Sequence, residues 1–374
     1  MYLTGSIRTD LHSPACALHV GRRPASSRPW QRVAVVAIAA LLATSCSVER
    51  RSPAIRADAV SIPRAEDIDL GTAGFGAVAP DPLRLWITAW PGYGLVLVGA
   101  STGMLNADGL RVEIAVAADP AQMSAGFKTG IVEAAAMKTF EALRMRSEGA
   151  PITIVGLLDH VTRETAILVP SSVADIKDFK GRQISVSRGT SGEFLLSVAL
   201  HSAALSERDV ILADLPIDVG NTELVNGTVV ATVSEEPYTT PFLAAHPAFR
   251  VLVSGADYAG FLSDALVVRD DIVRDRPGQV AALLKSLERT TEFMATHPVE
   301  SEKIVGQRLG ILPQSAALTL NGIRQYSLAE AKILLSDIPT TIGNVANAAR
   351  DAGLITRDVD PIAMVDTRFI NALG

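Results

Sequence analysis

The sequence predicts an α/β fold of two lobes, each a mostly parallel sheet flanked by helices, with a double hinge between them. Three observations lead to this prediction. Short apolar segments alternate with amphipathic segments of about 10–15 residues, which is the pattern of βαβ units. A chain of 374 residues, 48% of them hydrophobic, is long enough to bury two cores. Two apolar segments, near 166–172 and 262–268, are suited to cross between the lobes.

Each expected strand is a short apolar run, and each expected helix is a longer amphipathic one. The first lobe is predicted to hold strands 83–89, 111–117, 132–137, 152–159 and 165–170, with helices up to residue 103, at 120–130 and at 139–148. The second is predicted to hold strands 183–186, 210–216, 229–234 and 250–255, with helices from Thr190 and at 219–226. Strand 265–269 returns to the first lobe, and helices follow at 277–297, 301–309, 313–321, 327–335 and 340–352. The first lobe is thus expected to comprise 83–170 plus 265–374, and the second 171–264.

A basic leader precedes the body. Residues 1–45 hold five Arg, no Lys and one acid; subtracting these from the totals of 34 and 40 leaves 29 basic and 39 acidic residues, a net charge of −10. The apolar run 33–42 follows Arg32, as in a secretory signal peptide, and is shorter than the roughly 20 residues of a membrane-spanning helix. Small residues then lead to Cys46, which resembles a bacterial lipobox. We expect a signal peptide over 1–45 and a lipid on Cys46. The alternative is a soluble signal peptide with an incidental cysteine.

The segment 46–82 is expected to be a lipid-anchored linker, because Pro and Gly interrupt any periodic pattern. Its Gly-rich run at 71–76 follows no strand and leads into prolines, so it is interpreted as linker and not as a phosphate loop. The net charge of −6 argues against a general nucleic-acid-binding protein. Two cysteines cannot build a disulfide framework or a zinc cluster.

Seven segments of the body occur in the order and spacing of a known family. They are ITAWPGYG (87–94), GLRVEI (109–114), KTGIVEAAAMKTFEAL (128–143), GAPITIVGLLD (149–159), SVADIKDFKGRQISVSRGTSGEFLL (172–196), VVATVSEEPYTTPFL (229–243) and DALVVRDDIVRDRP (264–277). Over about 83–373 the chain resembles the periplasmic solute-binding proteins of the nitrate/sulfonate/taurine and thiamine-precursor group, which serve ABC importers. The resemblance implies a type II periplasmic-binding-protein fold. One departure is at 234–237, where a bulky residue often precedes Glu-Pro.

Two segments of the first lobe are candidates for contact with a solute. Trp90 and Tyr93 follow the first strand, and the resemblance implies that their loop lines the pocket. The alternative is that Trp90 packs beneath the first helix. Lys138 and Thr139 lie where the third strand gives way to a helix. Thr139 can cap that helix, whose N–H groups favour an anion, and Lys138 can supply a counter-charge.

A second set of candidates lies at the start of the helix after strand 183–186. Thr190 and Glu193, three residues apart, form a capping-box pattern. Thr190, Ser191 and Gly192 offer hydroxyl and N–H groups to a carboxylate, sulfonate or nitrate. Glu193 has two open roles, as the reciprocal cap or as a contact to the solute.

The remaining candidates are carboxylates and their neighbours near the expected cleft. The resemblance implies that Glu236 and Tyr238 belong to the pocket or its rim, although the sequence leaves open which of Glu235 and Glu236 faces it. Ends of strands near the lobe crossings add three more candidates, Asp159, His160 and Asp264. Helix N-termini favour an anion and carboxylates favour an amine, so the charge of the solute stays open.

These observations favour an exported, monomeric lipoprotein of the periplasm or cell surface. It is expected to capture a small polar solute between its lobes by hinge closure and to deliver it to the permease and ATPase of an ABC importer. The solute is expected to be sulfonate-, nitrate- or taurine-like, or thiamine-precursor-like. Widely spaced histidines, and no P-loop or Gly-x-Ser-x-Gly motif, favour a protein without catalysis, cofactor or metal. The alternatives are a ligand-sensing lipoprotein without transport, and a secreted enzyme on the same fold.

Overall fold

The computed structural model of the chain describes residues 74–161, 165–258, 262–355 and 357–373. The predicted signal peptide, Cys46 and most of the predicted linker lie outside the described residues. Residues 74–82, the described end of that linker, contain no helix or strand.

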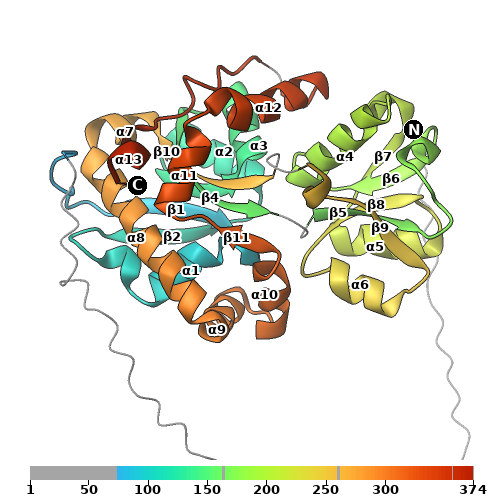
Figure 1. Cartoon of the computed structure of the whole chain (residues 1–374), viewed down its shortest axis with the longest axis horizontal. Coiled ribbons are helices and arrows are strands. Elements are labelled where there is room, and N and C mark those ends of the chain that lie inside the picture. Colours follow the sequence, from blue (N-terminus) through green and yellow to red (C-terminus); the bar gives the residue numbers. More distant parts are fainter. Residues whose placement is uncertain (1–73, 162–164, 259–261, 356, 374) are drawn as a thin grey trace, which may run out of the picture. The chain divides into compact units, whose positions relative to one another are not determined.

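A six-stranded sheet forms lobe 1, in the order β11-β4-β10-β3-β1-β2 (Figure 1). β1 pairs in parallel with β2 and β3, whereas β10 lies antiparallel between β3 and β4. β4 therefore runs in the same direction as the first three strands. The strands are β1 (Leu83–Thr88), β2 (Val112–Ala117), β3 (Ala134–Lys138), β4 (Ile152–Val161), β10 (Ser263–Arg269) and β11 (Ile323–Gln325).

A five-stranded sheet forms lobe 2, in the order β7-β6-β8-β5-β9. β6 pairs in parallel with β7 and β8, and β5 lies antiparallel between β8 and β9. In each sheet most strands run in one direction, as predicted. β10 and the edge strand β11 of lobe 1, and β5 of lobe 2, run in the opposite direction. The strands are β5 (Thr165–Pro170), β6 (Gln183–Val186), β7 (Ile211–Asp214), β8 (Ala231–Glu235) and β9 (Phe249–Ser254).

Helices flank both sheets (Figure 1). Those of lobe 2 are α4 (Ser191–Ser202), α5 (Ile217–Asn226) and α6 (Thr239–Ala245). Those that precede β4 or follow β10 are α1 (Gly94–Ser101), α2 (Pro120–Thr129), α3 (Thr139–Ser147), α7 (Asp270–Asp275), α8 (Pro277–Thr296), α9 (Pro298–Leu309), α10 (Pro313–Leu320), α11 (Leu328–Leu335), α12 (Ile338–Asp351) and α13 (Arg368–Leu373). The long helices agree with the prediction to within a few residues. The short elements α6, α7, α13 and β11 were not predicted, because runs of three to seven residues carry little periodicity.

The crossings between the sheets lie earlier than the sequence suggested. Thr165–Pro170 was expected to end lobe 1, with an apolar crossing near 166–172, but this segment is β5 and belongs to the sheet of lobe 2. Its apolar character has a different cause, because β5 is paired on both edges and its residues up to Val169 are buried. The chain leaves lobe 1 after β4 and returns to it between β9 and β10.

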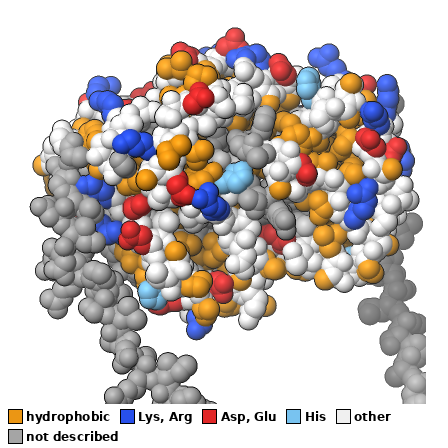
Figure 2. All heavy atoms as spheres, in the orientation of Figure 1, with side chains coloured by type: hydrophobic (Ala, Val, Ile, Leu, Met, Phe, Trp, Pro, Cys, Tyr) orange, Lys and Arg blue, Asp and Glu red, His pale blue; other side chains and the backbone are white. Residues whose placement is uncertain are grey.

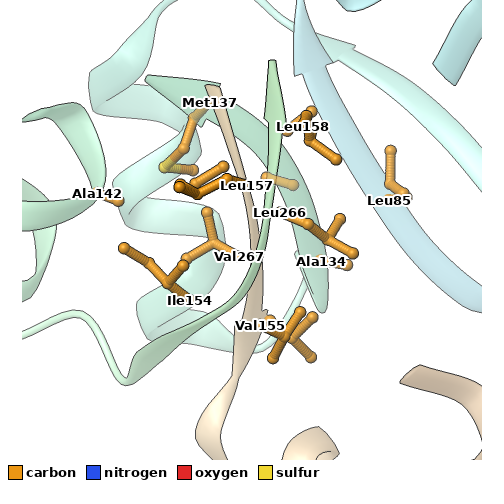
Figure 3. Packing of buried hydrophobic residues seen from close by; sticks show 14 of the residues in the cluster. Leu85, Ala134, Met137, Ala142, Ile154, Val155, Leu157, Leu158, Leu266 and Val267 are labelled. Atoms are coloured by element: carbon orange, nitrogen blue, oxygen red, sulfur yellow. The ribbon is translucent and has the colours of Figure 1, made fainter. Parts of the chain in front are cut away.

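The core of lobe 1 lies on both faces of its central strands. Met137 of β3, Ile154 of β4 and Val267 of β10 are all buried, and Ala142 of α3 lies against the same face (Figure 3). These strands are apolar on both faces along their middle, and Lys138, Asp159 and Asp264 lie together where β3 and β4 end and the antiparallel β10 begins. The polar residues of interest therefore lie at one edge of the sheet.

An aromatic pair connects the two lobes. Phe140 of α3 and Phe194 of α4 stack with their ring centroids 4.7 Å apart and their planes 6° from parallel. Both rings are fully buried, and Phe194 belongs to the same hydrophobic cluster as the core of lobe 1 although its helix covers the other sheet. The pair holds the first turns of α3 and α4 next to each other.

Replacing Phe194 by Ala is expected to lower the free energy of unfolding by about 3–5 kcal/mol, because the ring leaves a cavity between two packed helices. Urea unfolding followed by circular dichroism measures this loss. Leu312→Ala is the matched control, since Leu312 is 69% exposed and its loss should change stability by less than about 0.5 kcal/mol. Equal effects of the two substitutions would contradict the assigned packing.

Candidate functional site

A cavity of about 340 Å³ lies where the carboxyl ends of strands from both sheets meet. In sheets of this kind ligands bind outside the carboxyl ends of the strands. Residues that end or follow β1, β2 and β3 form one wall, and residues that end or follow β6, β7 and β8 form the other. The cavity is lined by Thr88, Ala89, Trp90, Tyr93, Ala118, Asp119, Pro120, Lys138 and Glu141 of lobe 1, and by Ser187, Thr190, Ser191, Gly192, Ile217, Val233 and Glu235 of lobe 2.

Lys138, at the end of β3, is a buried charge that the rest of the site surrounds. Its side chain is only 5% exposed, and its Nζ lies 3.4 Å from Oδ1 of Asp264, which is fully buried on β10. The backbone N–H of Asp264 in turn donates to Oδ1 of Asp159, at 3.3 Å. Burial raises the pKa of Asp159 well above its usual range, the Asp264 carboxylate adds to this, and Lys138 opposes it. Asp159 and Asp264 are absent from the lining of the cavity and lie behind Lys138.

The Trp90 ring is held in place on two sides. Nζ of Lys138 lies 3.8 Å from the centroid of the ring, a cation–π contact. A Cβ on Gly92 would lie 1.9 Å from ring atoms of Trp90, so the ring rests against the bare backbone of Gly92. Tyr93 meets the ring edge-on, with centroids 4.9 Å apart. Trp90 and Tyr93 both line the cavity, as the sequence predicted, yet Trp90 also has the packed environment of the alternative interpretation.

The start of α4 supplies part of the wall of lobe 2. The Thr190 hydroxyl accepts from the N–H of Gly192 at 3.2 Å, so Thr190 is the N-cap of α4. Thr190, Ser191 and Gly192 line the cavity, as predicted. Glu193 does not: its carboxylate accepts the Gly189 N–H at 2.6 Å and lies 3.0 Å from Nε of Arg188. Burial raises the pKa of Glu193 despite these partners.

Glu235, and not Glu236, faces the cavity from lobe 2. Val233 and Glu235 both line it, because alternate residues of a strand point to the same side. The Glu236 carboxylate turns away and accepts the Thr240 hydroxyl at 2.5 Å, which places it over the start of α6. Tyr238 is 49% exposed and lies outside the lining. Neither Glu236 nor Tyr238 therefore lines the cavity, and of the two predicted positions, pocket or rim, the rim remains a prediction.

Two further predicted residues also lie outside the cavity lining. The Thr139 hydroxyl donates to the backbone oxygen of Ser263 at 2.8 Å and so ties α3 to β10. His160 lies on β4, between its register partners Ser263 on β10 and Arg324 on β11. Both residues are near the Lys138 cluster, and neither is among the residues that enclose the cavity.

Glu141, on the first turn of α3, was not among the predicted site residues. Its side chain lines the cavity although the residue is only 8% exposed. Burial raises the pKa of Glu141 to about 7, and the Asp264 and Glu235 carboxylates add to this while Lys138 opposes it. The available signal was its position three residues after Lys138, which puts both at the same end of β3. Asp119, the N-cap of α2, was missed as well.

Charges elsewhere on the surface are mixed. Acidic and basic side chains are interspersed on the face drawn in Figure 2. Within the described ranges, no group of three or more His, Cys, Asp and Glu side chains could hold a metal ion. Across the same part of the chain, no helix is both long enough and apolar enough to span a bilayer.

The family model described as NMT1/THI5 like matches residues 90–301, more than half of the chain. The chain belongs to this family. The match includes the lining residues of both walls from Trp90 to Glu235, and Thr88 and Ala89 lie just before it.

Relatives of this NMT1/THI5-like protein have names of more than one kind. It is 25% identical over 218 residues to a Haemophilus influenzae protein named for thiamine biosynthesis. The aligned region covers 56% of this chain and 68% of the relative. It is 29% identical over 227 residues to a Bacillus subtilis protein named for binding aliphatic sulfonates, covering 60% and 67%. Among solved structures, the alkanesulfonate-binding protein SsuA of Xanthomonas axonopodis pv. citri, bound to MOPS, superimposes with a TM-score of 0.63 at 18% identity, covering 78% of this chain and 100% of that one. That likeness shows a shared fold.

The buried position of Glu141 predicts a stability that depends on pH. A carboxyl whose pKa rises on folding binds more protons in the folded state, so it costs stability as pH increases from its unfolded to its folded pKa. Glu141→Gln removes this cost. We expect the variant to gain up to about 3 kcal/mol of unfolding free energy at about pH 8 and little at about pH 5. Urea unfolding at both pH values measures the gain; a pH-independent difference would contradict the assignment.

The close contact between Gly92 and the Trp90 ring predicts that a side chain at position 92 changes the geometry of the site. Gly92→Ala places a methyl group within the Trp90 ring, so the ring must leave the cation–π contact with Lys138. We expect altered tryptophan fluorescence and a loss of about 1–3 kcal/mol of unfolding free energy. Gly343→Ala is the matched control, because a Cβ there meets its nearest atom at 3.7 Å. An unchanged fluorescence spectrum in Gly92→Ala would contradict this arrangement.

Proposed function

We propose that this protein is the solute-binding component of an ABC importer and captures a small polar solute in the cavity between its lobes. The observation that carries the proposal is that residues at the carboxyl ends of strands of both sheets enclose one cavity. A volume of about 340 Å³ suits a small molecule. The relative named for sulfonate binding and the shared fold with an SsuA protein also support it.

Binding would act by closure of the lobes. A solute that contacts both walls shifts the equilibrium between the open and closed states. The shift equals the difference between the binding free energies of the solute for the two states. The chain crosses between the sheets twice, which suits a hinge, and the Phe140–Phe194 stack lies where the helices of the two lobes meet. The permease would then recognise the closed form, and the solute would be released unchanged.

The location and partners belong to the same proposal. We propose export by the leader at 1–45, with a lipid on Cys46 and the segment 46–82 as a tether to the membrane. The partners would be a permease and its ATPase, and the protein would act as a monomer. Mass spectrometry of the membrane-bound protein tests the anchor; an unacylated N-terminus at or beyond Cys46 would remove it.

A screen for solutes tests the function. Sulfonates, nitrate, taurine, amino acids, polyamines and thiamine precursors are offered to the purified protein, and thermal shift reports binding. A true solute should also reduce the radius of gyration in small-angle scattering, because the lobes close. Ser191→Ala should weaken binding about fivefold by the loss of a hydrogen bond at the cavity wall.

Ser202→Ala is the matched control, since Ser202 lies at the other end of α4 and outside the lining. Closure without any association with a permease would favour a sensor. Conversion of a solute into product, with no change in scattering, would favour an enzyme and contradict the proposal.

A further inference from the structure

A second cavity, of about 320 Å³, lies within lobe 1 and shares no lining residue with the cavity between the lobes. It is enclosed by the end of α8, the start of α9, the end of α10 and the strand β11, which pack together (Figure 1). Its volume is close to that of the first cavity and suits a small molecule. The proposed function leaves this second cavity without a role.

Part of the wall of the second cavity is apolar and is held from behind. Met294, Leu320 and Ile323 supply this part. A Cβ on Gly94, at the start of α1, would lie 3.0 Å from Cδ2 of Leu320 and 3.6 Å from Cε of Met294, so both side chains pack against the backbone of Gly94. The apolar wall is therefore preformed, and an apolar group placed on it would displace water.

The polar part of the lining is rich in hydrogen-bond acceptors. Glu302 is the one ionisable residue of the lining, and among the residues that the structure describes its carboxylate forms no hydrogen bond or ion pair. The Ser301 hydroxyl donates to the backbone oxygen of His297 at 2.9 Å, so its own oxygen remains as an acceptor. Thr291 and Asn321 also line the cavity and can either donate or accept.

Gln325 contributes an amide oxygen that lacks a donor. Its Oε1 is buried, and no described group of the chain donates a hydrogen bond to it. A buried acceptor without a donor is costly. Gln325 lies on the edge strand β11 and lines the cavity together with Ile323, because alternate residues of a strand share a face. The last torsion of a Gln side chain is soft, so this amide can turn toward a donor in the cavity.

We propose that the second cavity is a further ligand site, for a small molecule with an apolar body and an ammonium group. The ammonium pairs with Glu302 and donates to Gln325, and the body lies on the apolar wall. An ammonium has three donors and no acceptor, which matches a lining with acceptors and one negative charge. An anion would meet the Glu302 carboxylate in a lining without Lys, Arg or His. The site goes beyond the proposed function, because it lies within one lobe.

Three probes of one shape test the class of ligand. Cyclohexylammonium is a cation, cyclohexanol is neutral with a hydroxyl donor, and cyclohexanecarboxylate is an anion. At about pH 7 both charged probes and the Glu302 carboxylate are ionised. Isothermal titration calorimetry should then show affinity falling in the order cation, neutral probe, anion, with about tenfold or more between the first and the last.

Two variants of the lining locate the binding. Glu302→Gln should weaken cyclohexylammonium binding about tenfold and leave the affinity for cyclohexanol within about threefold. Gln325→Met removes the amide oxygen at similar length and should weaken both probes about threefold or more. Glu300→Gln is the matched control and should change neither, because Glu300 is an exposed acid of the same helix outside the lining. Circular dichroism of each variant verifies that it folds.

A variant of the first cavity separates this inference from the proposed function. Ser191→Ala alters the wall between the lobes and should leave cyclohexylammonium binding unchanged. A loss of binding in Ser191→Ala, with none in the two lining variants, would place the probe between the lobes and overturn the second site. No cyclohexylammonium binding at millimolar concentration also overturns it, and cyclohexanecarboxylate binding as tightly overturns the class of ligand. The solute screen is independent of all these outcomes, since the two cavities share no lining residue.

Discussion

The site depends on the burial of the Lys138 ammonium against the Asp264 carboxylate. A buried charge without a partner is very costly, so the two groups must stay together. The antiparallel register of β3 and β10 places Lys138 directly opposite Asp264, and β10 also places Asp264 opposite Asp159 of β4. The neighbouring ends of β3, β10 and β4 are thereby held together. The Trp90 ring rests on the same ammonium, so the first wall of the cavity is built around this pair.

The strand order of lobe 1 brings this pair together. The pair forms only if β10, which follows the return crossing, lies next to β3, and the pairing of Asp264 with Asp159 places β4 on the other side of β10. That insertion makes the sheet mixed, and it brings residues more than 120 positions apart in the chain into contact, as in the bond from Thr139 to Ser263. β4 and β10, which flank the two crossings to lobe 2, therefore meet beside Lys138 at the cavity.

Much of the fold could be predicted from the sequence, because long elements have a clear hydrophobic period. Helix 277–296 and strand 183–186 agree with the prediction to within a residue, since each is bounded by polar or Pro residues. The role of Thr165–Pro170 could not be predicted, because an apolar run is equally suited to a crossing and to an interior strand. Only its pairing with β8 and β9 distinguishes the two.

The site was predictable where it follows from local chemistry and unpredictable where it follows from tertiary contacts. Trp90, Ser191 and Gly192 lie next to strand ends, so strand prediction alone finds them. Glu236 was assigned through the resemblance, and the alternation along β8 turns its neighbour Glu235 to the cavity instead. Glu141 has only one local signal, its position three residues after Lys138, and its burial depends on the packing of α3 beside α4.

Fold and charge selection are separable in a protein of this kind. The fold fixes helix N-termini at the carboxyl ends of the strands, and these would favour an anion in any protein that shares it. Side chains then decide whether that potential reaches the solute. Here Asp119, Glu141 and Glu193 occupy three helix starts with negative charge, and Glu235 adds a fourth carboxylate near the start of α4. A shared fold with a sulfonate-binding protein therefore does not fix the charge of the solute, because first-turn and strand-end carboxylates offset that potential.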